Sequence, residues 1–310
     1  MTREALIARV HEVVAEPIPL PGSGQTAERH QRLFDVGRED LSLARLVEAH
    51  WDAVAILAES GREPERGALY GVWAAEASDK VLRMEGGFLS GKKPFCSGAG
   101  IVDRALVTAK EPEARLLDVD LRGCDRRVCF DDSAWKASAF AETKTSEATF
   151  DAVPVKNSHV VGETGFYLAR PGFWHGACGP AACWAGGAAG LVQWALEQER
   201  HDPHTLAHLG AMSAAVWSMQ AVLRSAGAEI DAAWEDVEAA QIRALAVRLV
   251  IEQACTDVLR RLARAYGPHP LAMDEAIGRR YQELDLYVRQ SHAERDLEAL
   301  GRLLRKVKVT

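Results

Sequence analysis

The sequence lacks the features that mark several large classes of protein. Its six cysteines are scattered and form no pair of close couples, so we expect reduced thiols and no zinc framework. The net charge is −7 and no basic stripe is present, which argues against a nucleic-acid partner. No apolar run of membrane-spanning length is apparent, and residues 1–4 lack the basic start of a signal peptide. These absences favour a cytoplasmic protein with no membrane partner.

The chain is long and apolar enough to bury a sizeable core. Its 310 residues, of which 48% are hydrophobic, indicate two or three globular domains rather than a disordered chain. Apolar spacing predicts helices through residues 1–66. A loop rich in proline and glycine at 17–24 separates the first helix from a second that begins near Thr26. A third helix should open at Asp40 and end at Gly61, where glycine can adopt the left-handed cap.

The composition changes twice along the rest of the chain. Residues 67–168 contain short strands separated by turns, which is typical of a β-sandwich or barrel. Residues 169–310 contain four helices with apolar stripes, which pack as a bundle. One of these helices should begin at Asp202–Pro203 and end at Gly227. We therefore predict an α+β multi-domain fold with a short N-terminal helical domain (1–66), a middle β-sandwich or barrel domain and a C-terminal four-helix bundle domain.

The stretch 89–109 is the most informative about function. We expect its first strand to end in a turn at Ser90–Gly91, and a bulky aromatic residue, Phe95, follows this turn. The next residues are small, among them Ser97 and Gly98. Small residues beside an exposed aromatic let a flat ligand approach the backbone closely.

This stretch resembles the acyl-CoA dehydrogenase family. In that family a leucine, a small polar residue and a glycine precede a lysine, and a tryptophan and a threonine then meet the flavin. Phe95 would take the place of the tryptophan and Ser97 that of the threonine. Phe150–Val155 resembles the family's exit from the β-domain, and Tyr70–Glu76 stands where the family has its flavin-side strand. The order of the three domains is also that of the family, so the resemblance extends over residues 38–305.

The resemblance implies FAD as the cofactor and a small-molecule substrate, for which an acyl thioester is one candidate. It also implies a homodimer or homotetramer, because the bundle domain of this family joins subunits. Arg200 would reach toward the pyrophosphate, although the aromatic and glycine that follow this arginine in the family are missing. The residues assigned to the cofactor are Trp73, Ala75, Phe95, Cys96, Ser97 and Arg200.

The resemblance fails at the catalytic base. A dehydrogenase of this family needs a carboxylate whose pKa is raised by a desolvated site, so that it can take the α-proton. Ser291 stands at one of the family's two glutamate positions and Pro180 at the other. Ser291 and His292 are then the candidate catalytic residues, because a histidine can donate a hydrogen bond or a proton near neutral pH. His292 and Ser97, with His175 as a third member, are expected to line the flavin face.

Three functions remain open. The first is a flavin-dependent oxidoreductase that resembles acyl-CoA dehydrogenases without their glutamate. The second is a monooxygenase on the same fold that receives reduced flavin from a partner flavin reductase, which the missing glutamate favours. The third is a flavinless scaffold or binding protein, which the missing adenine contacts favour.

Structural roles compete with each functional assignment. Phe95 and Trp73 can be core aromatics, His292 an exposed or capping histidine, and His175 a packed loop residue. His201, His204 and His208 are spaced by three and four residues, and such spacing places side chains on one helix face, where histidines can bind zinc. The helix should begin only at Pro203, however, and no acidic partner has matching spacing, so no metal site is expected at His201, His204 and His208.

Overall fold

The structure is a computed structural model that describes residues 1–111, 113–124 and 126–307. Its internal contacts group the chain into two units, one made of Met1–Pro17 with Arg45–Phe173 and the other of Ile18–Ala44 with Trp174–Thr310. The first three helices are shared between the units. They are α1 (Arg3–Val14) in the first unit, α2 (Thr26–Glu39) in the second, and α3 (Leu41–Glu59), most of which belongs to the first. The division at residues 66 and 168 stays a prediction.

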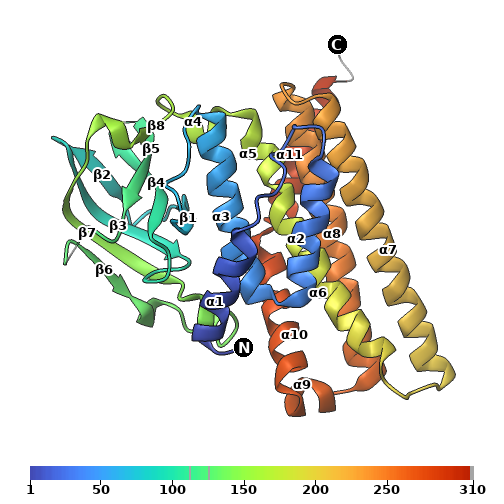
Figure 1. The fold of residues 1–310 in the computed structure, drawn as a ribbon. Helices are drawn as coiled ribbons and strands as arrows, with labels where there is room; N and C mark the ends of the chain where they lie inside the picture. Colours follow the sequence, from blue (N-terminus) through green and yellow to red (C-terminus); the bar gives the residue numbers. More distant parts are fainter. Residues whose placement is uncertain (112, 125, 308–310) are drawn as a thin grey trace. The chain divides into compact units, whose positions relative to one another are not determined.

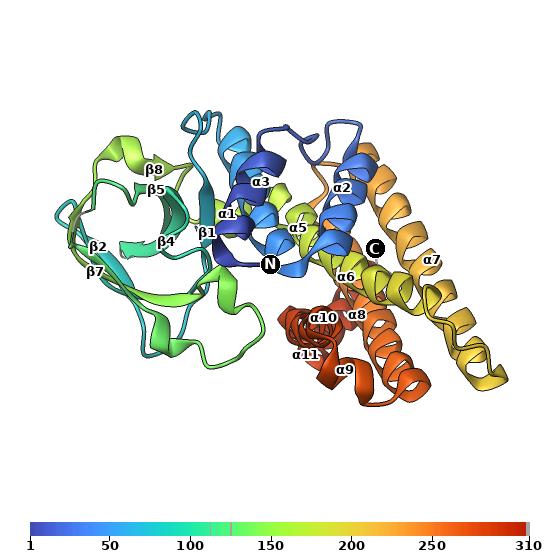
Figure 2. The same cartoon turned by 60° about the horizontal axis from the view of Figure 1, so that its bottom comes forward.

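The first unit is built on one curved sheet of eight strands (Figures 1 and 2). The strand order is β6-β7-β3-β2-β4-β5-β8, and β1 pairs with β4 in parallel. The strands are β1 (Tyr70–Trp73), β2 (Leu82–Glu85), β3 (Phe88–Cys96), β4 (Arg104–Glu111), β5 (Glu113–Asp120), β6 (Val128–Asp131), β7 (Ser146–Pro154) and β8 (Val160–Val161). The short helices η1 (Asp132–Ala134), η2 (Ala141–Thr143) and η3 (Asn157–His159) lie between strands, and α4 (Phe166–Ala169) follows β8.

Glycine positions explain how β3 runs. Gly86 and Gly87 have φ of 58° and 81°, so they form the turn of the β2–β3 hairpin. The turn predicted at Ser90–Gly91 is wrong, because β3 continues through both residues. Gly91 instead lets β3 pass close to the segment before β2, because a Cβ at this position would overlap the carbonyl oxygen of Val81. A glycine that permits close approach therefore looked like a turn in the sequence.

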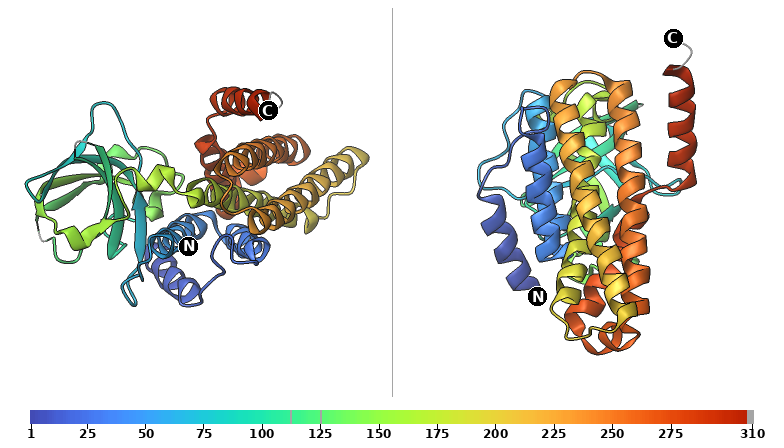
Figure 3. Two further views of the ribbon diagram at one scale, coloured as in Figure 1. Left: turned by 90° about the horizontal axis from the view of Figure 1, so that it is seen from above. Right: turned by 90° about the vertical axis from the view of Figure 1, so that its right-hand side faces the viewer.

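The second unit contains the long helices of the predicted bundle, which lie side by side (Figure 3). The division between the units falls within α5 (Pro171–Gly176). Besides α2, the helices that follow are α6 (Cys178–Leu196), α7 (Pro203–Ala232), α8 (Val237–Tyr266), α9 (His269–Met273), α10 (Glu275–Tyr287), η4 (Val288–Gln290) and α11 (Glu294–Val307). Contacts among α2, α6, α7 and α8 bury apolar residues of each helix, as expected for a bundle.

Small residues bring α2 and α6 into direct backbone contact. A Cβ on Gly186 would overlap the carbonyl oxygen of Phe34, and one on Gly37 would overlap that of Cys183. The alanine- and glycine-rich sequence of α6 thus serves close helix packing.

The ends of α7 show one expectation met and one corrected. Asp202 accepts hydrogen bonds from the backbone N–H groups of His204 and Thr205, at 3.2 and 3.1 Å, so the predicted cap is confirmed. Gly227 does not end the helix, which continues to Ala232. Gly227 lies where α7 meets α2, and its missing side chain makes room for the backbone of Ala27.

α7 also corrects the expectation about apolar length. Its 30 residues include an 18-residue window with a mean hydropathy of 1.3, which is enough by length and composition to cross a membrane, and 17% of that window is buried. One such helix indicates a membrane only weakly, because helices of soluble proteins meet the same criterion. The absence of a membrane partner stays a prediction.

Candidate functional site

Phe95 is an exposed aromatic held on a strained backbone in the first unit. Its side chain is 60% exposed, while Pro94 and Cys96 on either side are buried. The register between β3 and β7 shifts between Lys93 and Cys96, so the chain bulges and turns Phe95 outward. Its φ of 56° lies in the left-handed region, which is costly for an aromatic residue. Strain of this kind persists where the surrounding structure imposes it, often at functional sites.

Ser97, two residues further on, is fixed by three side chains. Its Oγ accepts a hydrogen bond from Arg45 Nε at 3.1 Å and lies 3.1 Å from Thr145 Oγ1. Its carbonyl oxygen accepts a hydrogen bond from Trp73 Nε1 at 3.0 Å. Trp73 is buried, so it supports this segment from behind. We call Arg45, Phe95, Ser97, Trp135 and Thr145 the Phe95 edge.

Arg45 places a positive charge at the Phe95 edge. Its guanidinium carbon lies 5.0 Å from the centre of the Phe140 ring and 5.9 Å from that of Trp135, both within cation–π range. Trp135 is partly buried and its Nε1 donates to the carbonyl oxygen of Ala139 at 2.9 Å. A cation enclosed by rings and hydroxyl groups suits a ligand that carries partial negative charge.

A pocket of about 160 Å³ adjoins the Phe95 edge, with Phe95, Trp135 and Thr145 in its wall. Glu147 in the same wall forms ion pairs of 2.6 Å with both Lys80 and Lys92. Hydrogen bonds from these lysines lower the pKa of Glu147. The pocket therefore offers two aromatic rings and hydroxyl donors. The charge of its one carboxylate, Glu147, is balanced by the two lysines.

The other residues assigned to this region lie behind the Phe95 edge or beside it. The Cys96 Sγ is buried and donates to the carbonyl oxygen of Lys93 at 3.4 Å, and burial raises the thiol pKa to about 12. Cys96 is therefore a protonated packing residue here. Lys93 is also buried, donates to Thr108 Oγ1 at 2.7 Å, and has a pKa lowered to about 8 by burial. Ala75 is exposed just after β1. The cofactor contacts of Cys96 and Ala75 stay predictions.

The candidate catalytic residues lie in the second unit. Ser291 follows η4 in extended conformation, and His292 is exposed. The carboxylate of Asp296 accepts from the His292 backbone N–H at 3.0 Å and lies 3.2 Å from Nδ1 of its ring. The carboxylate four residues from His292 thus holds the start of α11. The catalytic roles of Ser291 and His292 stay predictions.

His175 has a structural environment in the same unit. Its ring is buried and stacks on Trp234 with ring centres 4.5 Å apart, and its Nε2 lies 2.9 Å from the carbonyl oxygen of Trp234. These contacts favour the packed-residue assignment over a place at a flavin.

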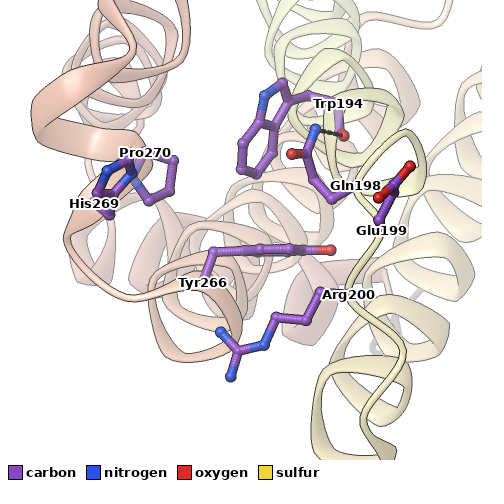
Figure 4. A pocket seen from close by; sticks show the side chains of 7 residues that line it. All are labelled: Trp194, Gln198, Glu199, Arg200, Tyr266, His269 and Pro270. Atoms are coloured by element: carbon purple, nitrogen blue, oxygen red, sulfur yellow. Dashed lines mark hydrogen bonds between the residues drawn. The ribbon is translucent and has the colours of Figure 1, made fainter.

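Arg200 lies at a second pocket, of about 340 Å³, at one end of the bundle. Its Nε pairs with Asp202 at 2.9 Å. Figure 4 shows Arg200 on one face of the Tyr266 ring, with Trp194 and Gln198 on the other. The Trp194 and Tyr266 rings meet edge to face at 5.0 Å. We call Arg200, Tyr266, Trp194 and Gln198, with Glu199, His269 and Pro270, the Arg200 pocket, which offers a ring surface beside a cation.

Within the part of the chain that the structure describes, no group of three or more histidine, cysteine, aspartate and glutamate side chains could hold a metal ion. Arg45, Trp135 and Thr145 were missed by sequence reasoning. The only local signals for them are an arginine among the apolar residues of α3 and a tryptophan in a polar loop.

The sequence matches no protein-family model and no curated protein. Solved structures do match. Methanesulfinate monooxygenase MsuC from Pseudomonas fluorescens superposes with a TM-score of 0.75 at 20% identity, over 90% of this chain and 82% of that one. TdsC from Paenibacillus sp. A11-2, solved with FMN and indole, has a TM-score of 0.77 at 17% identity, over 89% and 82%. PigA, solved with FAD and proline, has a TM-score of 0.78 at 14% identity, over 98% and 89%.

The chain therefore has an acyl-CoA dehydrogenase-like fold, as the order of its sequence motifs predicts. At sequence identities of 14–20%, these matches show a similarity of fold alone. What these proteins bind and catalyse bears on this chain only as a proposal.

Proposed function

We propose that the protein is a flavin-dependent oxidoreductase, and specifically a monooxygenase that receives reduced flavin from a partner reductase. The observation that carries this proposal is the Phe95 edge, where a strained, exposed ring stands beside hydroxyl groups and a cation. Phe95 is exposed on a strained backbone, and a ligand that contacts its ring would explain this arrangement.

The residues present fit a flavin. Its ring is flat and apolar on its faces and polar along one edge, which matches Phe95 beside Ser97, Thr145 and Arg45. When bound, the flavin would supply electron transfer and, in its reduced form, the reaction with oxygen. Phe95 would contact the ring, while Ser97 and Thr145 would hydrogen-bond to its polar edge.

Arg45 and Trp73 would prepare the Phe95 edge for this ligand. Arg45 holds Ser97 Oγ in one orientation and adds a positive charge, which favours the reduced, more negative form of the ligand. Trp73 fixes the Ser97 backbone and so limits reorganisation on binding.

The residues at the two glutamate positions favour oxygenation over dehydrogenation. Ser291 and Pro180 have no carboxylate, and Asp296 nearby is engaged at the start of α11. Proton abstraction next to a thioester needs such a base. The fold neighbours MsuC and TdsC, which are named as monooxygenases, support the same choice. The substrate is then a small molecule, and an acyl thioester stays one candidate.

For the cofactor we propose FAD, with Arg200 as the candidate contact for a pyrophosphate. Arg200 supplies a cation, and Trp194 and Tyr266 supply ring surfaces beside it. Fold neighbours were solved with FMN or with FAD, so the size of the flavin is the first point to measure. We also propose a homodimer or homotetramer.

The test supplies FMN or FAD to the purified protein, reduces it anaerobically and then adds oxygen in a stopped-flow spectrometer. A monooxygenase should bind the flavin and change the time course of reoxidation relative to free flavin. Bleaching of the oxidised, bound flavin by butyryl-CoA would instead identify a dehydrogenase. If neither flavin binds, the remaining function is that of a flavinless scaffold or binding protein.

A further inference from the structure

The first unit contains a second pocket, which shares no residue with the Phe95 edge. Its volume is about 360 Å³, and its wall comes from the end of α1, the middle of α3 and the loop that leads into β1. These three elements lie next to one another in Figure 2. The volume is within the range of small-molecule sites. We call this pocket the His50 pocket, and its wall includes Val14, Ala15, His50, Val54, Glu65 and Leu69.

His50 contributes a hydrogen-bond donor to this wall. The residue is buried, with 8% of its surface exposed, and its Nδ1 accepts a hydrogen bond from the backbone N–H of Tyr70 at 3.1 Å. Burial lowers the pKa of His50 to about 4, so the ring is uncharged near neutral pH. A neutral histidine that accepts at Nδ1 carries its one ring proton on Nε2. The backbone of Tyr70 therefore fixes Nε2 of His50 as a donor.

This donor has no acceptor within the protein. Among residues 1–111, 113–124 and 126–307, no group hydrogen-bonds to His50 Nε2, and protein atoms do not enclose this nitrogen. Because His50 lines the pocket, the pocket is the space from which an acceptor can reach it. A donor in a mostly buried side chain gains most from an acceptor that a ligand brings.

The hydrogen bond from Tyr70 also limits what the pocket can bind. A metal ion needs the lone pair of a ring nitrogen, but the lone pair of Nδ1 is occupied and Nε2 of His50 carries a proton. An anion is disfavoured as well, because Glu65 and the C-terminal end of α1 at Val14 place negative charge at the wall. Arg66 is exposed and offsets the charge of Glu65.

Apolar side chains make up much of the remaining wall. Val14 from α1 and Val54 from α3 are half-buried, and Leu69 just before β1 is buried. Hydrocarbon that covers these side chains is removed from water, which favours binding. The ligand that matches both parts of the wall combines an uncharged oxygen acceptor with an apolar group.

We propose that the His50 pocket binds a small uncharged molecule that carries a carbonyl oxygen on an apolar group. The oxygen accepts the hydrogen bond of His50 Nε2, and the apolar group covers the valines and the leucine of the wall. The His50 pocket lies at the start of β1, whereas Trp73 at the end of β1 supports the Phe95 edge. The proposal goes beyond the flavin site and does not depend on flavin binding.

A pair of probes of the same shape tests the chemistry of the ligand. Cyclohexylacetamide is uncharged, and cyclohexylacetate is its anionic counterpart. In an NMR titration of the whole chain without flavin, the amide should bind in the millimolar range, as expected for a small ligand. The carboxylate should bind about tenfold more weakly. With isotope-labelled histidine, the amide should shift the Nε2 and Hε2 resonances of His50, which the spectrum of His50→Asn identifies.

Three variants test the location. His50→Asn keeps an acceptor for the Tyr70 N–H, but its side chain ends short of the position of Nε2, so it should bind the amide about fivefold more weakly. Ala15→Trp, at an exposed position of the wall just after α1, should fill the pocket and abolish binding. Ala5→Trp is the matched control, because Ala5 is exposed on α1 outside the wall, and it should bind like the wild type.

Four results would overturn the proposal. Absence of amide binding by the wild type would leave the pocket to water, and tighter binding of the carboxylate would assign it to anions. Binding that leaves the His50 resonances unshifted would show that Nε2 is not the donor. An affinity unchanged in both His50→Asn and Ala15→Trp would place the bound amide elsewhere on the protein.

Discussion

The two units use side-chain size in opposite ways. In the second unit α2 and α6 touch through Gly37 and Gly186, and no larger residue fits between their backbones. In the first unit the strained position 95 carries a phenylalanine that faces solvent. Packing accounts for the glycines and leaves Phe95 unexplained. A strained residue whose side chain is mostly exposed is a stronger sign of function than a well-packed one.

The largest effect is expected where the glycines meet. Gly186→Leu should lower the free energy of unfolding of the second unit by about 4 kcal/mol, because the backbone of Phe34 would have to move. Gly210→Ala on α7 is the control: its Cβ meets nothing within 4 Å, so stability should stay equal or rise by about 0.5–1 kcal/mol. Denaturant unfolding followed by two probes measures both variants, and equal stability of Gly186→Leu would contradict the packing argument.

Two buried histidines, His30 in the second unit and His50 in the first, give a second comparison. Burial lowers the pKa of His30 and of His50 to about 4. Between pH 6.5 and 4 the unfolded chain therefore binds protons that the folded chain does not. Stability should fall as pH falls through this window, by up to about 3 kcal/mol for each histidine, and this contribution should be constant above it.

The variants His30→Asn and His50→Asn test this pH dependence. The asparagine amide can still donate to the carbonyl oxygen of Leu223 in place of His30, and its oxygen can accept from the backbone N–H of Tyr70 in place of His50. Each variant should flatten the pH profile of unfolding between pH 4 and 6.5. A profile unchanged by both would contradict the assignment.

Arg45 should strengthen the binding of flavin at the Phe95 edge, and more so for the more negatively charged, reduced flavin. Arg45→Gln is expected to weaken binding of reduced flavin about tenfold, which is 1.4 kcal/mol, and binding of oxidised flavin less. The exposed Arg224 on α7 supplies the control variant, Arg224→Gln. Anaerobic titration of both redox forms measures the difference, and an equal loss for both forms would show that Arg45 acts only by packing.

The smallest effect concerns strain at Phe95. Phe95→Gly should raise the stability of the first unit by about 1 kcal/mol, since glycine accepts a φ of 56°. Phe88 at the start of the same strand is 47% exposed without positive φ, so Phe88→Gly should lower stability by about 1 kcal/mol. Thermal unfolding of the pair measures the contrast, which disappears if Phe95 is unstrained.

Local sequence signals predicted the fold correctly where a residue type has a single structural role at its position. Asp202 caps α7 and Gly86–Gly87 turn the β2–β3 hairpin, as their types and spacing require. Gly227 and Gly91 were misread as stops, because glycine serves both turns and close approaches and the sequence does not distinguish them. The partner that each glycine approaches comes from a distant segment.

Part of the candidate site could likewise be predicted from local sequence, and part could not. Phe95 and Ser97 follow from a local motif. Arg45 and Thr145, which hold the Ser97 hydroxyl, are 52 and 48 residues away, so only the folded chain brings them there. Their contribution depends on tertiary contacts, and no spacing rule in the sequence describes those contacts.

The most direct test of the central claim uses the two exposed phenylalanines of β3 in a flavin fluorescence titration. Wild type and Phe88→Ala should bind flavin with equal affinity, whereas Phe95→Ala should bind about tenfold or more weakly, as expected for loss of an aromatic contact. Equal affinity for all three proteins, or no binding by the wild type, would contradict a flavin site at the Phe95 edge.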